Sequence, residues 1–410
     1  MIRRTLGLGV AMATFASVAS FSAQAETVKI AFIDPLSGGF GAVGISGLKQ
    51  YQYTAGVLNK EGGTQFEVTG YDNKISPKES LIQLKRVIAD GIQFVVQGNS
   101  SGVANALTDA INKHNKRNPD KRVLFLNYSA VDPKLTNEKC NFWHFRFDAN
   151  ADMKMNALTD VIAEDKGMKK IYLLGQNYSF GKAVAAAAVK FLGEKRPDLK
   201  IVGNELHPIG KVKDFSPYIA KIKASGAQAL ITGNWGADMQ NLAKAAQDSG
   251  LKIPLYTYYA ANNGITKAIG AGGVDRVRLV AEGTTNPPMT EKWRTLLQGF
   301  KAKHPNEDFT QTRITNVMSM LKKAIAKAGS AKPIKVAAAL EGMEHKAFWG
   351  DTVTMRASDH QLQMPIRILV HTDKGIEFDG DNSGFGLLNE STVTAAEAST
   401  PTSCKMKRPS

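Results

Sequence analysis

The chain has 410 residues, of which 43% are hydrophobic and 22% are charged, as expected of a globular protein. Its formal net charge is +15, but the lysines and arginines are spread along amphipathic segments beside acidic residues. This distribution indicates a solvated surface rather than a nucleic-acid-binding one, and it leaves the steering of anionic solutes as the functional alternative.

The first 25 residues have the pattern of a secretory signal peptide. Arg3 and Arg4 precede an apolar run from Leu6 to Phe21, and Ala23-Gln24-Ala25 supplies small residues before a cleavage site after Ala25. The arginine pair could also indicate twin-arginine export. No later segment approaches the roughly 18 apolar residues of a membrane helix, and the residue directly after the cleavage site is Glu26 rather than a Cys. We expect a soluble mature protein outside the cytoplasm, without a lipid anchor.

From Val28 onward, apolar strands alternate with helical patterns, which predicts mostly parallel α/β sheets covered on both faces. The first unit contains expected strands at 28–33, 66–71, 94–96, 123–126 and 142–147, with helices at 42–59 and 78–89 and a third after residue 101. The pattern restarts at Asp148, with helices at 151–165, 180–192, 217–224 and 237–247 and strands at 171–174, 201–206, 229–231, 255–258 and 277–281. Expected helices at 291–303, 311–328 and 333–341 and strands at 352–356 and 366–370 return to pack on these units.

Two units of similar size predict two Rossmann-like lobes joined by a hinge of three chain crossings, near 147–150, 282–287 and 345–351. We assign residues 26–147 and 285–346 to lobe 1, residues 148–284 and 347–385 to lobe 2, and residues 386–410 to a C-terminal tail. Cys140 and Cys404 are the only cysteines. In an oxidising compartment they should form one disulfide that holds the tail to the first lobe.

The stretch FVVQGNSSGVANALTDAIN predicts a buried strand, a polar elbow at Gly98–Ser101 and a helix. Unpaired backbone N–H groups and the helix dipole would meet two hydroxyls at this elbow, which suits a small anion such as a carboxylate. Aromatic residues in strand-end loops of both units predict a cleft with flat apolar walls. They are Phe40, Tyr128, Tyr178, Trp235, Tyr258, Tyr259 and Trp349.

One motif favours an enzyme. Gly39–Gly44 matches G-x-G-x-x-G between a strand and a helix, as in a dinucleotide site. In that site the first glycine makes the turn directly off the strand, whereas here residues 34–38 intervene and Pro35 stiffens the turn. The seven His residues have no obvious partners, and no two of them lie at metal-binding spacing. We therefore expect neither catalysis nor a metal or organic cofactor.

Several segments together resemble the periplasmic solute-binding proteins of ABC importers of the leucine/isoleucine/valine-binding type. They are VKIAFIDPLSGGFGAVG, YDNKISPKES, the Ser-Ser elbow, LFLNYSAVDPKLT, QNYSFGKAV and ITGNWGADM. The resemblance implies the type I periplasmic-binding-protein fold, hinge closure over a small solute, a monomer in the periplasm, and delivery to an inner-membrane permease. The alternatives are a secreted NAD(P)-dependent oxidoreductase and a ligand-sensing regulatory module of the same fold.

Carried over by residue, the resemblance places the ligand site on the elbow, the loop after the fourth strand, and aromatic residues of both lobes. The positions are Asn99, Ser100, Ser101, Ser129, Ala130, Val131, Tyr178, Trp235, Tyr259 and Phe40. Val131 replaces a Thr that usually grips the carboxylate, and Tyr259 replaces the acid that pairs with an α-ammonium.

The loss of that acid bears on the cargo. Burying an ammonium without a charged partner costs several kcal/mol of binding free energy. A hydrogen bond to a Tyr hydroxyl offsets only on the order of 1 kcal/mol of that cost. The expected cargo is therefore a small carboxylate, either an aromatic or other organic acid, or an amino acid if Asp132 or Glu282 supplies the missing charge.

Overall fold

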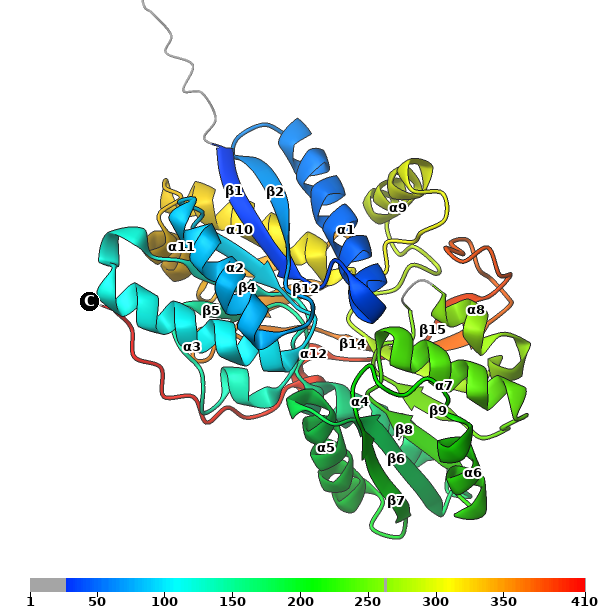
Figure 1. The fold of residues 1–410 in the computed structure, drawn as a ribbon. Coiled ribbons are helices and arrows are strands. Elements are labelled where there is room, and N and C mark those ends of the chain that lie inside the picture. The colour runs from blue at the N-terminus through cyan, green and yellow to red at the C-terminus, as the bar shows by residue number, and fades with distance from the viewer. Residues whose placement is uncertain (1–26, 262–263, 410) are drawn as a thin grey trace, which may run out of the picture.

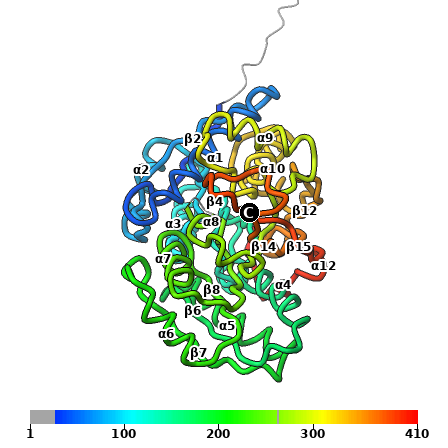
Figure 2. The backbone as a smooth tube through the Cα atoms, turned by 90° about the vertical axis from the view of Figure 1, so that its right-hand side faces the viewer, coloured from blue at the N-terminus to red at the C-terminus, as the bar shows by residue number. Residues whose placement is uncertain are grey.

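The computed structural model describes residues 27–261 and 264–409, so the proposed signal peptide lies outside the described residues. Two α/β lobes lie one above the other in Figures 1 and 2, each with a central sheet covered by helices. The predicted two-lobed α/β fold is confirmed. Among the described helices, none is long and apolar enough to cross a membrane.

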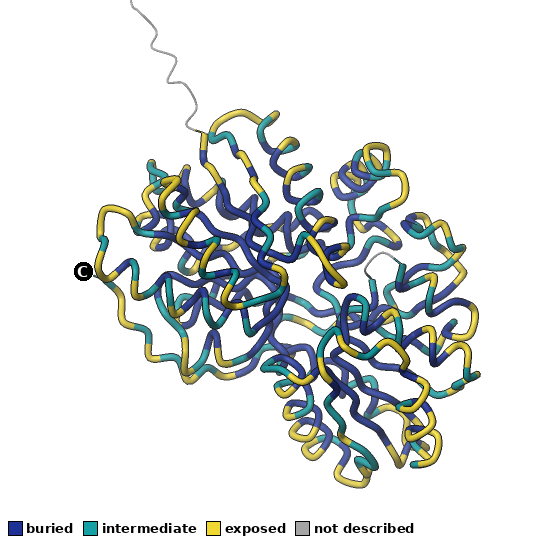
Figure 3. Tube along the Cα trace, in the orientation of Figure 1, coloured by how far each residue is buried: buried dark blue, intermediate teal, exposed yellow. Residues whose placement is uncertain are grey.

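The first lobe is built on a five-stranded parallel sheet of order β2-β1-β3-β4-β5. Its strands are β1 (Thr27–Asp34), β2 (Gln65–Asp72), β3 (Phe94–Gln97), β4 (Leu124–Asn127) and β5 (His144–Arg146). The lobe's helices are α1 (Gly41–Lys60), α2 (Pro77–Ala89), α3 (Ser101–Arg117), α9 (Glu291–Lys303), α10 (Arg313–Ala328) and α11 (Pro333–Leu340). Strands β3, β4 and β5 are buried along their whole length, as continuous apolar strands between two helical layers should be (Figure 3).

The second lobe is built on a seven-stranded sheet of order β15-β14-β10-β9-β8-β6-β7. Its strands are β6 (Lys170–Gln176), β7 (Lys200–His207), β8 (Ala229–Thr232), β9 (Leu255–Thr257), β10 (Val277–Ala281), β14 (Ile366–Thr372) and β15 (Gly386–Val393). The helices are α4 (Ala151–Glu164), α5 (Ser179–Lys195), α6 (Ser216–Ala224), α7 (Gly236–Asp248) and α8 (Ile265–Ile269). Only β14 and β15 run antiparallel to their neighbours in this sheet.

The structure corrects the predicted start of the C-terminal tail. Residues 386–393 form β15, which pairs with β14 at the edge of the second sheet. The prediction is wrong because most of this segment is polar and only half-buried, so its sequence resembles that of a solvated tail. The short helix α12 (Ala395–Ala398) follows, and its Thr394 and Glu397 form a reciprocal capping box.

The third crossing between the lobes also differs from the prediction. Strands β11 (Glu344–Lys346), β12 (Thr352–Met355) and β13 (Leu362–Gln363) form a small sheet. Gln361 bridges to Arg146 at the end of β5, so this small sheet lies against the first lobe. The chain therefore crosses at 364–365, just before β14, and not at 345–351.

The glycine-rich motif after β1 has a packing role. A Cβ atom at Gly44 would lie 1.8 Å from the carbonyl oxygen of Pro35, so only glycine allows α1 to approach the loop after β1 this closely. Gly181 stands in the same relation to the carbonyl oxygen of Gln176, at the start of α5 after β6. In each lobe, the helix that follows the first strand thus packs against the end of that strand or the loop after it through a glycine.

Candidate functional site

The side chain of Asp34, at the end of β1, anchors the elbow between β3 and α3 by hydrogen bonds. The Asp34 carboxylate accepts the backbone N–H of Asn99 at 3.0 Å, the backbone N–H of Gly98 at 3.2 Å and the hydroxyl of Tyr128 at 2.6 Å. Two of the N–H groups that the sequence offered to an anion are therefore already bound. The anion-binding groups of the elbow reduce to the two serine hydroxyls and the first N–H groups of α3, which have no acceptor within the helix.

Asp34 should make the stability of the protein depend on pH. Burial raises its pKa from 3.8 to about 7, against the opposing hydrogen bonds from Tyr128, Asn99 and Gly98. Because the folded-state pKa lies above the unfolded one, the folded protein binds the extra proton, and stability is lost as pH rises from about 4 to about 7. Relative to Asp34→Asn, the wild type should lose up to about 4 kcal/mol over this range. Urea unfolding at several pH values measures the difference, and a constant difference would contradict the assignment.

A cavity of about 360 Å³ lies between the lobes at the elbow. It is lined by Val43, Gly98, Asn99, Ser100, Ser101, Ser129, Val131, Tyr178, Phe180, Trp235, Tyr259, Gln311 and Arg313. Eight of the ten residues that the sequence placed in the site are among them, and Ala130 and Phe40 are not.

Ala130 and Phe40 lie next to the cavity. The backbone N–H and carbonyl of Ala130 are both bound to the side chain of Asn127, at 2.8 Å each, which fixes the loop after β4. Phe40, in the middle of the glycine-rich motif, packs on Trp235 with ring centroids 4.4 Å apart. Phe40 thus closes the cavity from outside, as a contact between the two lobes.

Aromatic side chains of the second lobe cover the elbow. Trp235 precedes α7, Tyr178 precedes α5, and the Trp235 indole N–H donates to the Tyr178 hydroxyl at 2.8 Å. The hydroxyl of Tyr259 donates to the backbone oxygen of Ser129 in the first lobe at 3.1 Å. The two lobes therefore touch across the site, and the structure has a closed cleft.

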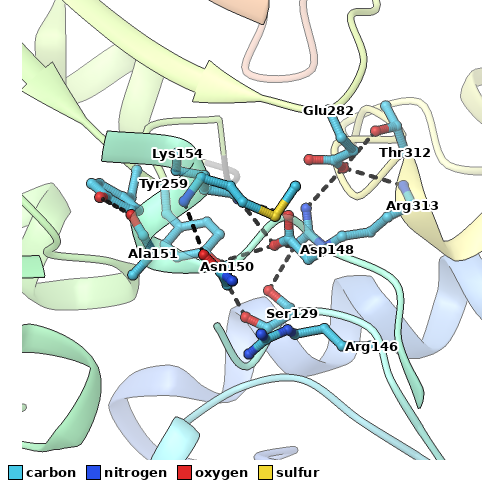
Figure 4. Close-up of polar contacts among 12 residues, drawn as sticks. Ser129, Arg146, Asp148, Asn150, Ala151, Lys154, Tyr259, Glu282, Thr312 and Arg313 are labelled. Atoms are coloured by element: carbon cyan, nitrogen blue, oxygen red, sulfur yellow. Dashed lines mark hydrogen bonds and ion pairs between the residues drawn. The ribbon is translucent and has the colours of Figure 1, made fainter. Parts of the chain in front are cut away.

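Sequence reasoning missed Arg313, the first residue of α10, which lines the cavity with only 8% of its side chain exposed. Its guanidinium donates to the hydroxyl of Ser129 at 2.9 Å and to the carboxylate of Glu282 at 3.1 Å. It also lies 3.6 Å from the carboxylate of Asp148 (Figure 4). No motif marks this arginine, because a charged residue at the start of an amphipathic helix is usually on the surface.

Four buried charges of alternating sign make up a network behind the cavity. Lys154 pairs with Asp148 at 2.8 Å, and Arg313 joins Asp148 to Glu282 (Figure 4). Burial alone would raise the pKa of Glu282, but Arg313, Lys154 and the Thr312 hydroxyl together lower it to about 2. Glu282 is thus an ionised partner of Arg313, and neither it nor Asp132 lines the cavity.

The structure locates the described residues that bear on a metal site and on the dinucleotide motif. No group of three His, Cys, Asp or Glu side chains among them is arranged to hold a metal ion. In the glycine-rich motif, Phe40 occupies the space beside Trp235, and Gly44 is pressed against Pro35. The motif therefore serves helix packing and contact between the lobes.

A family model described as periplasmic binding protein matches residues 27–375, nearly the whole described chain. The chain belongs to the periplasmic binding protein family. This binding protein is 32% identical to the Leu/Ile/Val-binding protein homolog 4 of Brucella melitensis biotype 1, over 98% of each chain. Membership favours the solute-binding interpretation over the oxidoreductase interpretation of Gly39–Gly44.

Solved structures agree with this assignment. The binding protein superposes on the closed leucine-, isoleucine-, valine-, threonine- and alanine-binding protein of Brucella ovis with a TM-score of 0.82 and 31% identity, covering 94% of this chain and all of the other. A solute-binding protein from R. palustris in complex with benzoate shares the fold, with a TM-score of 0.77 at 16% identity over 92% of this chain and 99% of the other. The two-lobed arrangement is thus that of ABC-transporter solute-binding proteins.

Cys140 and Cys404 form a disulfide, with Cα atoms 5.7 Å apart. The pairing agrees with the expectation from the two cysteines. It attaches the segment after α12 to the loop between β4 and β5 of the first lobe.

Proposed function

We propose that this binding protein captures a small carboxylate without an α-ammonium group and delivers it to an inner-membrane ABC permease. One observation carries the proposal: the described lining of the cavity contains an arginine and no acidic residue. A ligand ammonium would enter this cavity without a charged partner, at a cost of several kcal/mol. A ligand carboxylate would instead meet the Arg313 guanidinium, two serine hydroxyls and the N-terminus of a 17-residue helix.

The walls suit a compact apolar body. Tyr178, Trp235, Tyr259 and Phe180 present ring surfaces, and Val43 and Val131 complete the apolar lining. Flat rings and aliphatic groups favour an aromatic or branched hydrocarbon substituent on the acid. The residues that bind the carboxylate, in this proposal, are Ser100, Ser101, Ser129 and Arg313, with Asn99 and the aromatic residues shaping the pocket.

Closure of the hinge gives the mechanism. The elbow, Ser129 and Arg313 all belong to the first lobe, so the acid docks there while the cleft is open. The second lobe then brings Tyr178 and Trp235 over the ligand, excludes water and strengthens the charged hydrogen bonds. We propose that the closed monomer docks on the permease from the periplasm and that it catalyses no reaction.

The cargoes in the names of similar proteins include branched-chain amino acids and benzoate. These names leave both an amino acid and an ammonium-free carboxylate open as the ligand of this chain. The proposal between them therefore rests on the chemistry of its own pocket. Matched ligand pairs that differ only in the ammonium group separate the two possibilities.

A thermal-shift assay on protein that has been unfolded and refolded to remove bound ligand tests the proposal. The pairs are leucine with 4-methylpentanoate, and phenylalanine with 3-phenylpropanoate, beside benzoate and its neutral counterpart benzamide. A ligand at about 100 times its Kd should add roughly 2.7 kcal/mol, a shift of several degrees. We expect one of the ammonium-free acids to give the shift and its amino-acid partner and benzamide to give none. Stabilisation by leucine or phenylalanine alone would overturn the proposal.

A further inference from the structure

The segment after β15 connects the lobes at a fourth place, which lies directly beside the third crossing of the hinge because Val393 pairs with Ile366. Its first part belongs to the second lobe, because β15 pairs with β14 and the side chain of Asn156 on α4 donates to the backbone oxygen of Glu397 at 2.9 Å. From Ser399 the segment contacts the first lobe. In Figure 1 it runs from α12, close to α4, along the first lobe to the C-terminus.

The contacts with the first lobe lie on both sides of Cys404 along the segment. The hydrogen bonds include Arg356 Nη1 to Thr400 O (2.9 Å), Thr402 Oγ1 to Thr136 O (3.1 Å), Ser403 N to Asn137 Oδ1 (2.9 Å) and Arg408 Nη2 to Ala357 O (2.8 Å). Arg408 also forms an ion pair with Glu341 at 2.9 Å. Most of these residues are partly exposed, so each bond contributes modestly and would exchange readily with water. The Cys140–Cys404 bond keeps the partners together when one of them breaks.

We infer that residues 394–404 form a strap that holds the two lobes near their closed arrangement, and that the disulfide locks the strap. Opening the cleft moves α4 and the loop that carries Cys140 relative to each other, because these belong to different lobes. The strap must then give up its hydrogen bonds to one lobe. Cys404 follows Glu397 by seven residues, so even the stripped, extended strap spans at most about 25 Å. With the disulfide broken, the strap can separate from the first lobe. It then no longer opposes opening through its hydrogen bonds and no longer limits how far the lobes move apart.

The ligand-free protein provides the test, so the result does not depend on the identity of the solute. Small-angle X-ray scattering should give a larger radius of gyration after reduction of the wild type, and for Cys140→Ser/Cys404→Ser. Hydrogen exchange of the cleft amides at 98–103 and 233–238 should become about three- to tenfold faster in both samples. Lys405→Ser, in an exposed position beside the disulfide, should behave as the oxidised wild type.

Thiol titration confirms the redox state of each sample, and near-ultraviolet circular dichroism confirms that it is folded. If the double variant fails to fold, reduction of the folded wild type carries the test alone. Identical scattering curves and identical cleft exchange rates for oxidised and reduced protein would overturn the inference. That outcome would leave the proposed cargo untouched.

Discussion

Replacing Arg313 with methionine should lower the free energy of unfolding by about 3–5 kcal/mol near neutral pH, because it leaves Glu282 and Asp148 buried with only Lys154 to balance them. The pKa of Glu282 in the folded protein is about 2, below its ordinary value of 4.5. The stabilisation by this carboxylate is therefore fully present above about pH 4.5 and is lost as the pH falls towards 2. Urea unfolding of the ligand-free proteins measures the effect.

Two control variants separate the network from a general loss of charge. Arg117→Met removes an exposed arginine at the end of α3 and should change the stability by no more than about 0.5 kcal/mol. Arg313→Lys keeps the charge but loses the planar fork that reaches Ser129 and Glu282 together, so it should fall between wild type and Arg313→Met. Equal stability of Arg313→Met and wild type would show that the network is not formed.

Tyr259→Glu should abolish measurable binding of the carboxylate that stabilises the wild type, with at least a ~100-fold loss of affinity. The substitution places an anion in the cavity wall, where it would strongly repel the ligand carboxylate at close range in a dehydrated site. It also creates an acid of the kind that accepts an α-ammonium. The amino-acid partner of the same ligand pair should consequently bind the variant better than the wild type. Isothermal titration with both ligands gives the two affinities.

Tyr259→Phe is the matched control, since it keeps the ring and removes the hydroxyl that donates to Ser129 O and to Asp148. Neither of these bonds is made to the ligand, so their loss should weaken binding of the acid by no more than about tenfold. If Tyr259→Glu binds the acid as tightly as Tyr259→Phe does, position 259 does not face the ligand's charged end.

The elements that the sequence predicts well are those whose apolar residues repeat at the helical or strand period. The strands from β1 to β10 and the helices from α1 to α11 include almost every predicted segment, because each buries one face or both. The elbow was also predictable as a turn, since Gly98–Ser101 separates a buried strand from an amphipathic helix. β15 was not, because its burial comes from pairing with β14 at a sheet edge.

Contacts between side chains that lie far apart in the sequence could not be predicted from local periodicity. Arg313 meets Ser129 across 184 residues and Glu282 across 31, and no local pattern links them. Asp34 likewise looks like an ordinary turn residue at the end of β1, but the structure places it under the elbow, 65 residues away in sequence. The departure at Tyr259 was visible only through the resemblance, whereas the absence of acids from the described lining of the cavity needed the structure.

Asp34 has a consequence for the speed of capture. By holding the backbone of Gly98 and Asn99 from below, it fixes the loop in its bound shape before any solute arrives. The entropy of ordering this loop is therefore lost when the protein folds, and no further ordering is needed at the encounter. Solute association with the open first lobe should then proceed at close to the rate of collision, and the lifetime of the complex should follow how often the second lobe swings away.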